Sequence, residues 1–263
     1  MIRSGHNSLP WLIVQRWERL LFAHWPVHPR VLRRLLPRAV EPDEYGGAAW
    51  VAIVAFVMTG TRAATRPVWR GLPPIPELNV RTYVRHEGVP GVWFLSLDTN
   101  SPLFVSMGRA LFGLRYRLAR MAAVADGDCV HYVSSAGDAA FASTHAPCGP
   151  AAPAVPGSLE HFLVERYRLF AERRGRLITG VVAHRPWPLQ PAEAEIRLNR
   201  MAPPGVVLDG QPLLHFCRGV DAAISAPASL RTTGLRPRTR ITPWRSPTTS
   251  SKSPSSAASA TAS

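Results

Sequence analysis

Lysine is almost missing from this sequence. The chain has 263 residues and 31 basic side chains, yet Lys252 is its only lysine. An enzyme that works through a Schiff base needs a lysine amine beside its substrate. Lys252 lies in a segment dominated by Ser, Thr, Pro and Ala, and such a composition cannot form a packed core. We therefore expect no lysine in the folded part and exclude imine chemistry there.

Acidic residues are missing from the end of the chain. All 17 lie between Glu18 and Asp221, whereas six bases follow Asp221. Residues 1–222 hold the other 25 bases, so this part carries a net charge of +8 out of the total of +14. Its bases are scattered rather than gathered in a stripe with interleaved aromatic residues, as a nucleic-acid groove requires. We therefore do not expect this part to bind nucleic acid, and the alternative is nucleic-acid binding through the basic tail.

Long apolar runs and paired cysteines are also lacking. The longest uncharged apolar run, Ala48 to Met58, is much shorter than the ~20 residues of a membrane-spanning helix. The N-terminus has no signal-peptide core with a cleavage site, so we expect a cytoplasmic protein without membrane association. Three cysteines without a C-x-x-C pair argue against a disulfide framework or a structural zinc site. We expect no metal and no cofactor.

What is present is the pattern of a strand-rich domain. Residues 48–58 are apolar at odd and even positions alike, which predicts a strand buried on both faces. Residues 77–85 alternate, and a turn joins them to a second strand at 92–98. The remaining patterns predict strands at 115–124, 128–135, 177–184 and 213–220, and helices at 103–111 and 159–171, capped by Ser101 and Ser158.

These patterns predict one α+β domain with a curved, mainly antiparallel sheet or barrel and a few flanking helices. The domain is expected to span residues 1–222. Residues 223–263 have no periodicity and almost no large apolar side chains, which predicts a disordered basic tail.

Two of the predicted strands carry side chains suited to chemistry. Glu77, Asn79 and Arg81 point to one side of the first, where a carboxylate beside a guanidinium can orient a polar ligand. Tyr116 and Arg120 share a face of the predicted strand 115–124 and could hold a carbonyl and a carboxylate. The alternatives are a solvent-exposed sheet face in the first case and an arginine lying along a sheet edge in the second.

Several strings resemble the YqjF-like family of uncharacterised bacterial proteins. They are FAHWPVHP (22–29), PELNVRTYV (76–84), GVWFLSLD (91–98), LEHFLVERYRLF (159–170), HRPWPLQ (184–190) and PLLHF (212–216). The resemblance covers about residues 15–221. The family in turn looks like a distant relative of acetoacetate decarboxylase, which implies an antiparallel β-barrel or cone that encloses a cavity.

The resemblance also bears on the missing lysines. In the decarboxylase, a Schiff-base lysine follows a short Gly-x-Pro segment, and an adjacent lysine lowers its pKa. The segment that looks equivalent here starts at Gly113 and places Tyr116 and Arg117 at the two lysine positions. Relatives carry their final strand a little beyond the position of Asp221, whereas this chain departs from the family at about Ala222. We therefore expect part of that strand to be missing.

Two functions fit these observations. In the first, the protein is a lyase or an enol-type enzyme acting on a keto acid, with Glu77 and Tyr116 as catalytic residues. Glu77 would move a proton and Tyr116 would polarise a carbonyl, while Arg81, Asn79 and Arg120 would bind the substrate. In the second, the cavity binds a small molecule without catalysis. The expected partner in both is a small anionic metabolite, and a homo-oligomer is among the states that the sequence allows.

Overall fold

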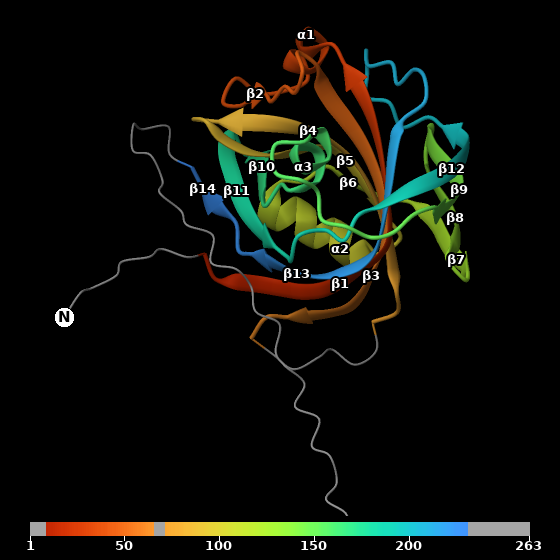
Figure 1. Cartoon of the computed structure of the whole chain (residues 1–263). Helices are drawn as coiled ribbons and strands as arrows, with labels where there is room; N and C mark the ends of the chain where they lie inside the picture. The colour runs from red at the N-terminus through yellow and green to blue at the C-terminus, as the bar shows by residue number, and fades with distance from the viewer. Residues whose placement is uncertain (1–8, 66–71, 231–263) are drawn as a thin grey trace, which may run out of the picture.

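Hydrogen bonds join the strands of this protein into one long sheet, described for residues 9–65 and 72–230 by a computed structural model (Figure 1). The strands are β1 (Trp11–Val27), β2 (Glu41–Pro42), β3 (Ala49–Ala63), β4 (Ile75–His86), β5 (Val89–Thr99), β6 (Tyr116–Leu118), β7 (Arg120–Asp126), β8 (Cys129–Ala136), β9 (Ala139–Pro147), β10 (Arg168–Arg173), β11 (Arg176–Ala183), β12 (Gln190–Asn199), β13 (Leu213–Ser225) and β14 (Ala228–Ser229). The helical segments are α1 (Pro29–Arg33), α2 (Pro102–Met107), the π-helical turn η1 (Gly108–Phe112) and α3 (Leu159–Val164). A mostly antiparallel, strand-rich architecture with few helices is therefore confirmed.

The sheet curves back on itself. Its strands follow the order β14-β11-β10-β5-β4-β3-β1-β13-β12-β9-β8-β7, and β11 also pairs with β13 through Val182 with Ile224 and Ala183 with Ala223. The strands that lie between β11 and β13 in this order thus surround an interior, and in Figure 1 α2 and α3 lie within their curve. Strands β7, β8 and β9 extend from one side as an arm.

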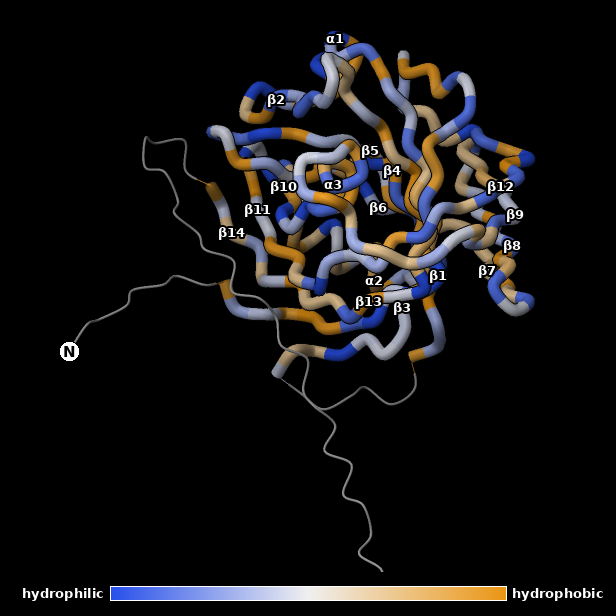
Figure 2. The backbone as a smooth tube through the Cα atoms, viewed as in Figure 1, coloured by the Kyte–Doolittle hydropathy of each residue, from blue (hydrophilic) through white to orange (hydrophobic). Residues whose placement is uncertain are grey.

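Strand β3 separates two hydrophobic clusters. Val51, Ile53 and Ala55 pack on one face of the sheet, whereas Val54 and Phe56 pack on the other. All the residues from Val51 to Met58 are buried, which confirms the predicted two-sided burial, and hydrophobic segments run along these central strands in Figure 2. One cluster supports the outer arm, and the other forms the walls of the interior.

The predicted hairpin of β4 and β5 is also confirmed. His86 pairs with Val89 across a two-residue turn, in which Glu87 and Gly88 both have positive φ angles of 49° and 77°. A turn with two positive φ angles matches the twist of the flanking strands.

The predicted helix at 159–171 is wrong in its second half. Ser158 does cap α3, because its side chain accepts a hydrogen bond from the His161 backbone N–H, but α3 ends at Val164. Residues 168–173 instead form β10, in which Leu169 and Phe170 pair with β5. Both side chains are buried, so pairing with the sheet overrides a local pattern that suited a helix.

The predicted helix at 103–111 is correct in place but not in form. It runs as α2 from Pro102 and continues through η1 to Phe112. Ser101 occupies the N-cap position, although its side chain makes no capping hydrogen bond.

The predicted boundary at residue 222 is also wrong. Strand β13 continues to Ser225, and β14 pairs Ala228 and Ser229 with Thr179 and Ile178 of β11. The last strand is therefore not cut short at Ala222, and the sheet takes in five residues that we had assigned to the tail, three in β13 and two in β14. The rest of the predicted disordered tail, residues 231–263, lies outside the described residues.

Two expectations about sulfur and membranes can be compared with the fold. Cys129, Cys148 and Cys217 are free thiols. No helix within residues 9–65 and 72–230 is long and apolar enough to cross a membrane.

A buried acidic residue ties the end of α3 to the sheet. Asp43 bonds Arg166 Nη1 through Oδ2 at 2.7 Å and Arg85 Nε through Oδ1 at 2.5 Å. The side chains of Asp43 and Arg166 are only 3% and 6% exposed. Arg166 follows α3 directly, so this ion pair helps to hold α3 over the interior.

We expect Asp43→Asn to destabilise the protein by about 3–5 kcal/mol, the cost of leaving a buried charge without its partner. Chemical denaturation of the full chain measures the loss. Glu18→Gln is the matched control, because it removes one carboxylate from the exposed pair with Arg16, and exposed pairs contribute little. Equal effects of the two substitutions would contradict the role given to Asp43.

Candidate active site

Strand β4 presents three polar side chains to the interior of the sheet. Glu77, Asn79 and Arg81 alternate with Leu78 and Val80, which pack on the opposite face. The strand lies between β3 and β5 and pairs with both, so its polar side chains are directed into the space that the sheet surrounds. The structure therefore places this face in a cavity rather than in solvent.

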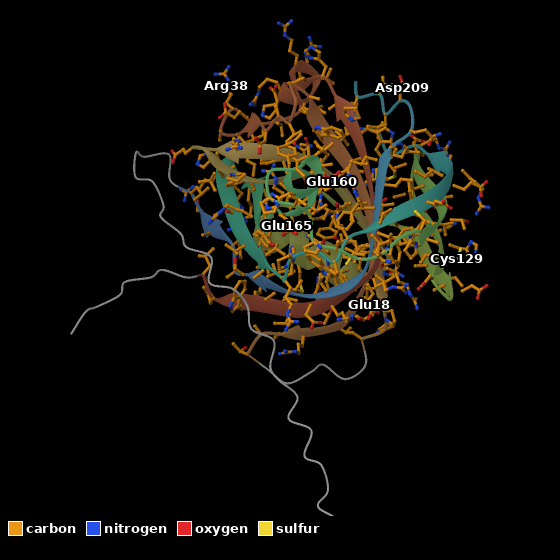
Figure 3. All side chains as sticks on the ribbon, in the orientation of Figure 1. Glu18, Arg38, Cys129, Glu160, Glu165 and Asp209 are labelled. Carbon is orange, nitrogen blue, oxygen red and sulfur yellow. The ribbon has the colours of Figure 1, made fainter. Side chains whose placement is uncertain are left out.

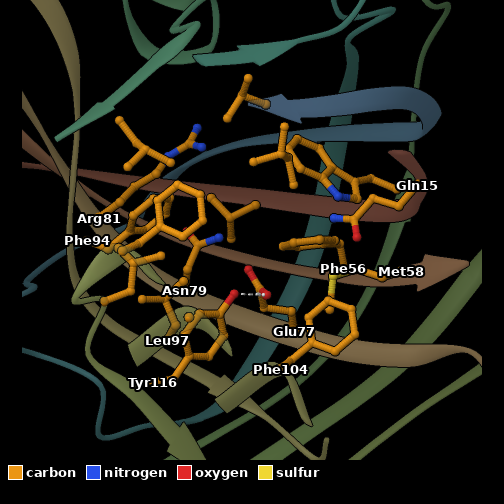
Figure 4. Close-up of a pocket in the computed structure, with 18 of the residues that line it drawn as sticks. Gln15, Phe56, Met58, Glu77, Asn79, Arg81, Phe94, Leu97, Phe104 and Tyr116 are labelled. Carbon is orange, nitrogen blue, oxygen red and sulfur yellow. Dashed lines mark hydrogen bonds between the residues drawn. The ribbon is translucent and has the colours of Figure 1, made fainter. Parts of the chain in front are cut away.

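The cavity has a volume of about 120 Å³ (Figure 4). An apolar cavity of about 150 Å³ holds a molecule as large as benzene, so this space suits a compact metabolite. Most of its walls are hydrophobic, and they come from α2, from η1 and from strands far apart in the sequence. The apolar lining includes Leu20, Phe22, Val54, Phe56, Met58, Phe94, Leu97, Phe104, Met107, Leu111, Phe112, Leu114, Leu169, Val182, Trp187 and Ile224.

A hydrogen-bonded pair stands at the centre of the cavity wall. The Tyr116 hydroxyl donates to Glu77 Oε2 at 2.7 Å, as the dashed line in Figure 4 marks. Glu77 is 6% and Tyr116 9% exposed. No salt bridge joins Glu77 to a cation among residues 9–65 and 72–230, so the pair is held by a neutral donor in apolar surroundings.

The chain around Tyr116 fixes its position. Strand β6 runs parallel to β5, with Tyr116 beside Leu97, and Arg109 Nε donates to the Tyr116 carbonyl at 2.9 Å. The Tyr116 ring packs against the backbone of Gly108, where a Cβ atom would lie 2.3 Å from ring carbon Cδ2. A glycine at this point of η1 is therefore what allows the ring to reach Glu77.

Burial changes the protonation of both members. Loss of hydration raises the pKa of Glu77 from its ordinary 4.5 to about 7, and the charge of Asp98 adds to this effect, while hydrogen bonds from Tyr116 and Asn79 oppose it. Burial also raises the pKa of Tyr116 well above its ordinary value, and the Glu77 charge raises it further. Tyr116 therefore stays a proton donor at neutral pH, where Glu77 exists in both forms.

Arg81 brings positive charge to the same cavity. Its Nη2 donates to the Leu163 carbonyl at 3.5 Å, and its guanidinium carbon lies 5.6 Å from the centre of the Phe22 ring and 5.9 Å from that of Tyr83. No acidic side chain forms a salt bridge with it within the described part of the chain. Its charge is thus available to an anion that enters the cavity.

Four of the five predicted site residues thus lie around one cavity: Glu77, Asn79, Arg81 and Tyr116. The fifth does not. Arg120 is exposed in β7 and is not among the lining residues, because the predicted strand 115–124 breaks at Ala119 into β6, which pairs with β5, and β7, which pairs with β8. Tyr116 and Arg120 therefore do not share a face.

Arg117, placed by the resemblance at the second lysine position, also points elsewhere. Its Nε bonds Asp98 Oδ1 at 2.6 Å, and it does not line the cavity. No group of three or more His, Cys, Asp or Glu side chains suited to a metal ion occurs in residues 9–65 and 72–230.

Sequence reasoning missed the contribution of β1. Gln15, Trp17, Leu20 and Phe22 all line the cavity, although the first two have odd numbers and the last two even ones. The β-bulge between Glu18 and Leu21 and the positive φ of 57° at Arg19 change the parity of the strand. A test for strict alternation cannot find such a lining, whereas the density of apolar and aromatic residues in 11–25 could have indicated a buried strand.

Comparison with known proteins agrees with this architecture. The model of the DUF2071 family, described as "Uncharacterized conserved protein", matches residues 14–221. "Uncharacterized protein YqjF" of Bacillus subtilis (strain 168) is 41% identical over 216 residues, or 80% of this chain and 89% of the relative. The predicted resemblance to YqjF-like proteins is therefore confirmed.

Solved structures show the same fold at low sequence identity. Acetoacetate decarboxylase from Legionella pneumophila matches with a TM-score of 0.60 and 14% identity, over 88% of this chain and 92% of that one. The enduracididine biosynthesis enzyme MppR complexed with pyruvate matches with a TM-score of 0.60 and 13% identity, over 86% and 93% of the two chains. The acetoacetate decarboxylase-like fold is thus confirmed.

The raised pKa of Glu77 predicts how stability depends on pH. The unfolded carboxyl group ionises near pH 4.5, whereas the folded one keeps its proton up to about pH 7. The stabilisation from this group is therefore complete below pH 4.5 and is lost as the pH rises to about 7, a change of about 3 kcal/mol.

We expect the free energy of unfolding of the wild type to fall by this amount, relative to that of Glu77→Gln, between pH 4.5 and 8. Denaturant titrations of both proteins across this range provide the measurement. His145 and His184, whose burial lowers their pKa to about 4, titrate in both proteins and cancel in the difference. A constant difference across this range would show that the Glu77 carboxyl has an ordinary pKa.

Proposed function

This chain belongs to the DUF2071 family, and from that premise we propose that its cavity catalyses lyase or enol-type chemistry on a small keto acid without a Schiff-base lysine. The observation that carries the proposal is the buried Glu77–Tyr116 pair, with its 2.7 Å hydrogen bond, in the same cavity as Arg81. In this account the curved sheet acts as the cone that shields the reaction from water.

Binding begins with the charge of Arg81. Within the described residues this guanidinium has no acidic partner and lies beside aromatic rings, so it favours the carboxylate of a substrate over a neutral molecule. Asn79 lies between Arg81 and Glu77 along β4, and its buried Oδ1 has no hydrogen-bond partner among the residues that the structure describes. Its amide group can therefore hold a polar atom of the substrate between the binding and reacting ends.

The reaction uses the ionised form of Glu77 as a base. The carboxylate takes a proton from the carbon next to the substrate carbonyl; the C–H electron pair forms a carbon–carbon double bond, and the carbonyl π electrons move to oxygen. Tyr116 turns its hydroxyl proton from Glu77 to that oxygen and stabilises the enolate. Return of the proton to carbon completes a tautomerisation, whereas departure of a leaving group from the neighbouring carbon gives a lyase reaction.

Two further facts support a keto acid as the substrate class. The sequence has no lysine before residue 252, so proton transfer is the chemistry that the cavity side chains can offer. MppR, a protein of the same fold, has been solved in complex with pyruvate, and we carry this ligand class over to the present cavity as part of the proposal.

Deuterium exchange tests the chemistry before the natural substrate is known. Wild-type protein incubated in D₂O with a panel of 2-oxo acids should replace the C3 hydrogens of at least one of them, as measured by proton NMR. Because Glu77 must be ionised, the rate should rise with pH and level off above about pH 7.

Variants assign the steps. Glu77→Gln should slow exchange by at least about 10²-fold, Tyr116→Phe by about 10²-fold, and Arg81→Met should mainly raise KM. The matched control is Arg197→Met, which removes an exposed arginine on β12 and should leave the exchange rate unchanged. Saturable binding of a 2-oxo acid without exchange would contradict the enzyme and establish a binding protein instead. Unchanged exchange in Glu77→Gln and Tyr116→Phe would contradict the residue assignment.

A further inference from the structure

Strand β7 ends the sheet, and nothing in residues 9–65 and 72–230 pairs with its outer edge. It lies on the arm that extends from the curved part of the sheet in Figure 1. Cys129, which begins the neighbouring strand β8, lies at the rim of the molecule in Figure 3. The backbone N–H and C=O groups along such an edge are ready to pair with another strand.

The sequence of β7 has none of the features that usually block an edge. Its seven residues, RMAAVAD, contain no proline, lysine or bulge, and charges occur only at the two ends. The middle is apolar, with Met121, Ala123 and Ala125 half-buried on one face and Val124 62% exposed on the other. An edge of this kind favours pairing with another strand over exposure to solvent.

The two charges of β7 are opposite in sign and symmetrically placed. Arg120 begins the strand and Asp126 ends it, both are exposed, and neither forms a side-chain hydrogen bond or salt bridge within the described residues. If a second copy of β7 lies antiparallel to the first, Arg120 faces the partner's Asp126, and the same contact repeats at the other end. Ala123 then lies opposite its own copy on the two-fold axis.

We propose that the chain forms a two-fold dimer in which the β7 strands of two copies pair antiparallel, with Arg120 opposite the partner's Asp126. This register pairs all seven residues of β7. In this register each residue lies opposite one on the same face of the partner strand. Ala122 lies opposite the partner's Val124 on the exposed face, and Met121 lies opposite the partner's Ala125 on the half-buried face. The half-buried face of one arm thereby continues into that of the other, as an isologous contact requires.

Arg120 thus belongs to an interface rather than to the cavity. The proposed dimer does not depend on the proposed catalysis, since β7 contributes no residue to the cavity lining. Either proposal can therefore fail without the other.

Charge reversal tests the pairing. Light scattering and sedimentation of the full chain should show a species of twice the chain mass. Arg120→Asp or Asp126→Arg places like charges opposite each other at both ends and should weaken the dimer about tenfold or more. The double exchange, Arg120→Asp with Asp126→Arg, should restore it. Thermal melting of each variant checks that these exposed substitutions leave the fold intact.

Disulfide trapping tests the register. In a background of Cys129→Ser and Cys148→Ser, Ala123→Cys places two thiols across the axis at the Cα separation of about 4.5–5.5 Å of opposed antiparallel residues, which a disulfide spans. The matched control, Ala125→Cys, has its thiol on the same half-buried face but about 13 Å along the strands from its copy. Mild oxidation should cross-link the first variant and not the second.

A wild-type chain that remains monomeric at 100 µM, the concentration chosen for the assay, would overturn the proposal. So would a dimer that is unaffected by both single charge reversals, or equal cross-linking at positions 123 and 125. A monomeric chain would mean that the β7 edge pairs with something other than a second copy of this chain.

Discussion

The cavity depends on a carboxyl group that is kept in apolar surroundings and forms no salt bridge with any residue that the structure describes. Glu77 tolerates this position because Tyr116 donates a hydrogen bond at 2.7 Å, and because the group can hold its proton up to about pH 7. The parallel strand β6, the Arg109 contact and the bare backbone of Gly108 together bring Tyr116 to that carboxyl. Burial of an isolated charge is costly. The contacts that position Tyr116 and the retained proton of Glu77 therefore act together to allow this carboxyl group to be buried.

The adjacent strand, β5, carries a buried carboxylate whose charge is balanced by an ion pair. Asp98 lies on β5 opposite Leu78 and is fully buried, yet it bonds Arg117 at 2.6 Å and Ser134 at 3.1 Å. One acid is thus paired and structural, whereas Glu77 is held by a tyrosine and left able to exchange a proton. Different surroundings give two carboxyl groups different tasks, and this contrast is the physical basis on which we assign proton transfer to Glu77.

The sequence predicted the local patterns well and the long-range ones poorly. Alternation in 77–85 and two-sided apolarity in 48–58 are direct consequences of which face is buried, so they identified β4, β3 and three of the four predicted site residues that line the cavity. The bulge in β1 hid Gln15 and Trp17 because it changes the parity of the strand. The break at Ala119 misplaced Arg120, and the pairing of Leu169 and Phe170 with β5 ended α3 early. These features arise from pairing between distant segments, which periodicity within one segment does not encode.

Burial turns Glu77 into a base suited to neutral pH in a largely apolar cavity. A ¹³C NMR titration of the side-chain carboxyl carbons, with the Glu77 resonance assigned by its absence from Glu77→Gln, measures this directly. We expect a single transition for that resonance at about pH 7. A transition near pH 4.5, the ordinary value for a solvated glutamate, would contradict it.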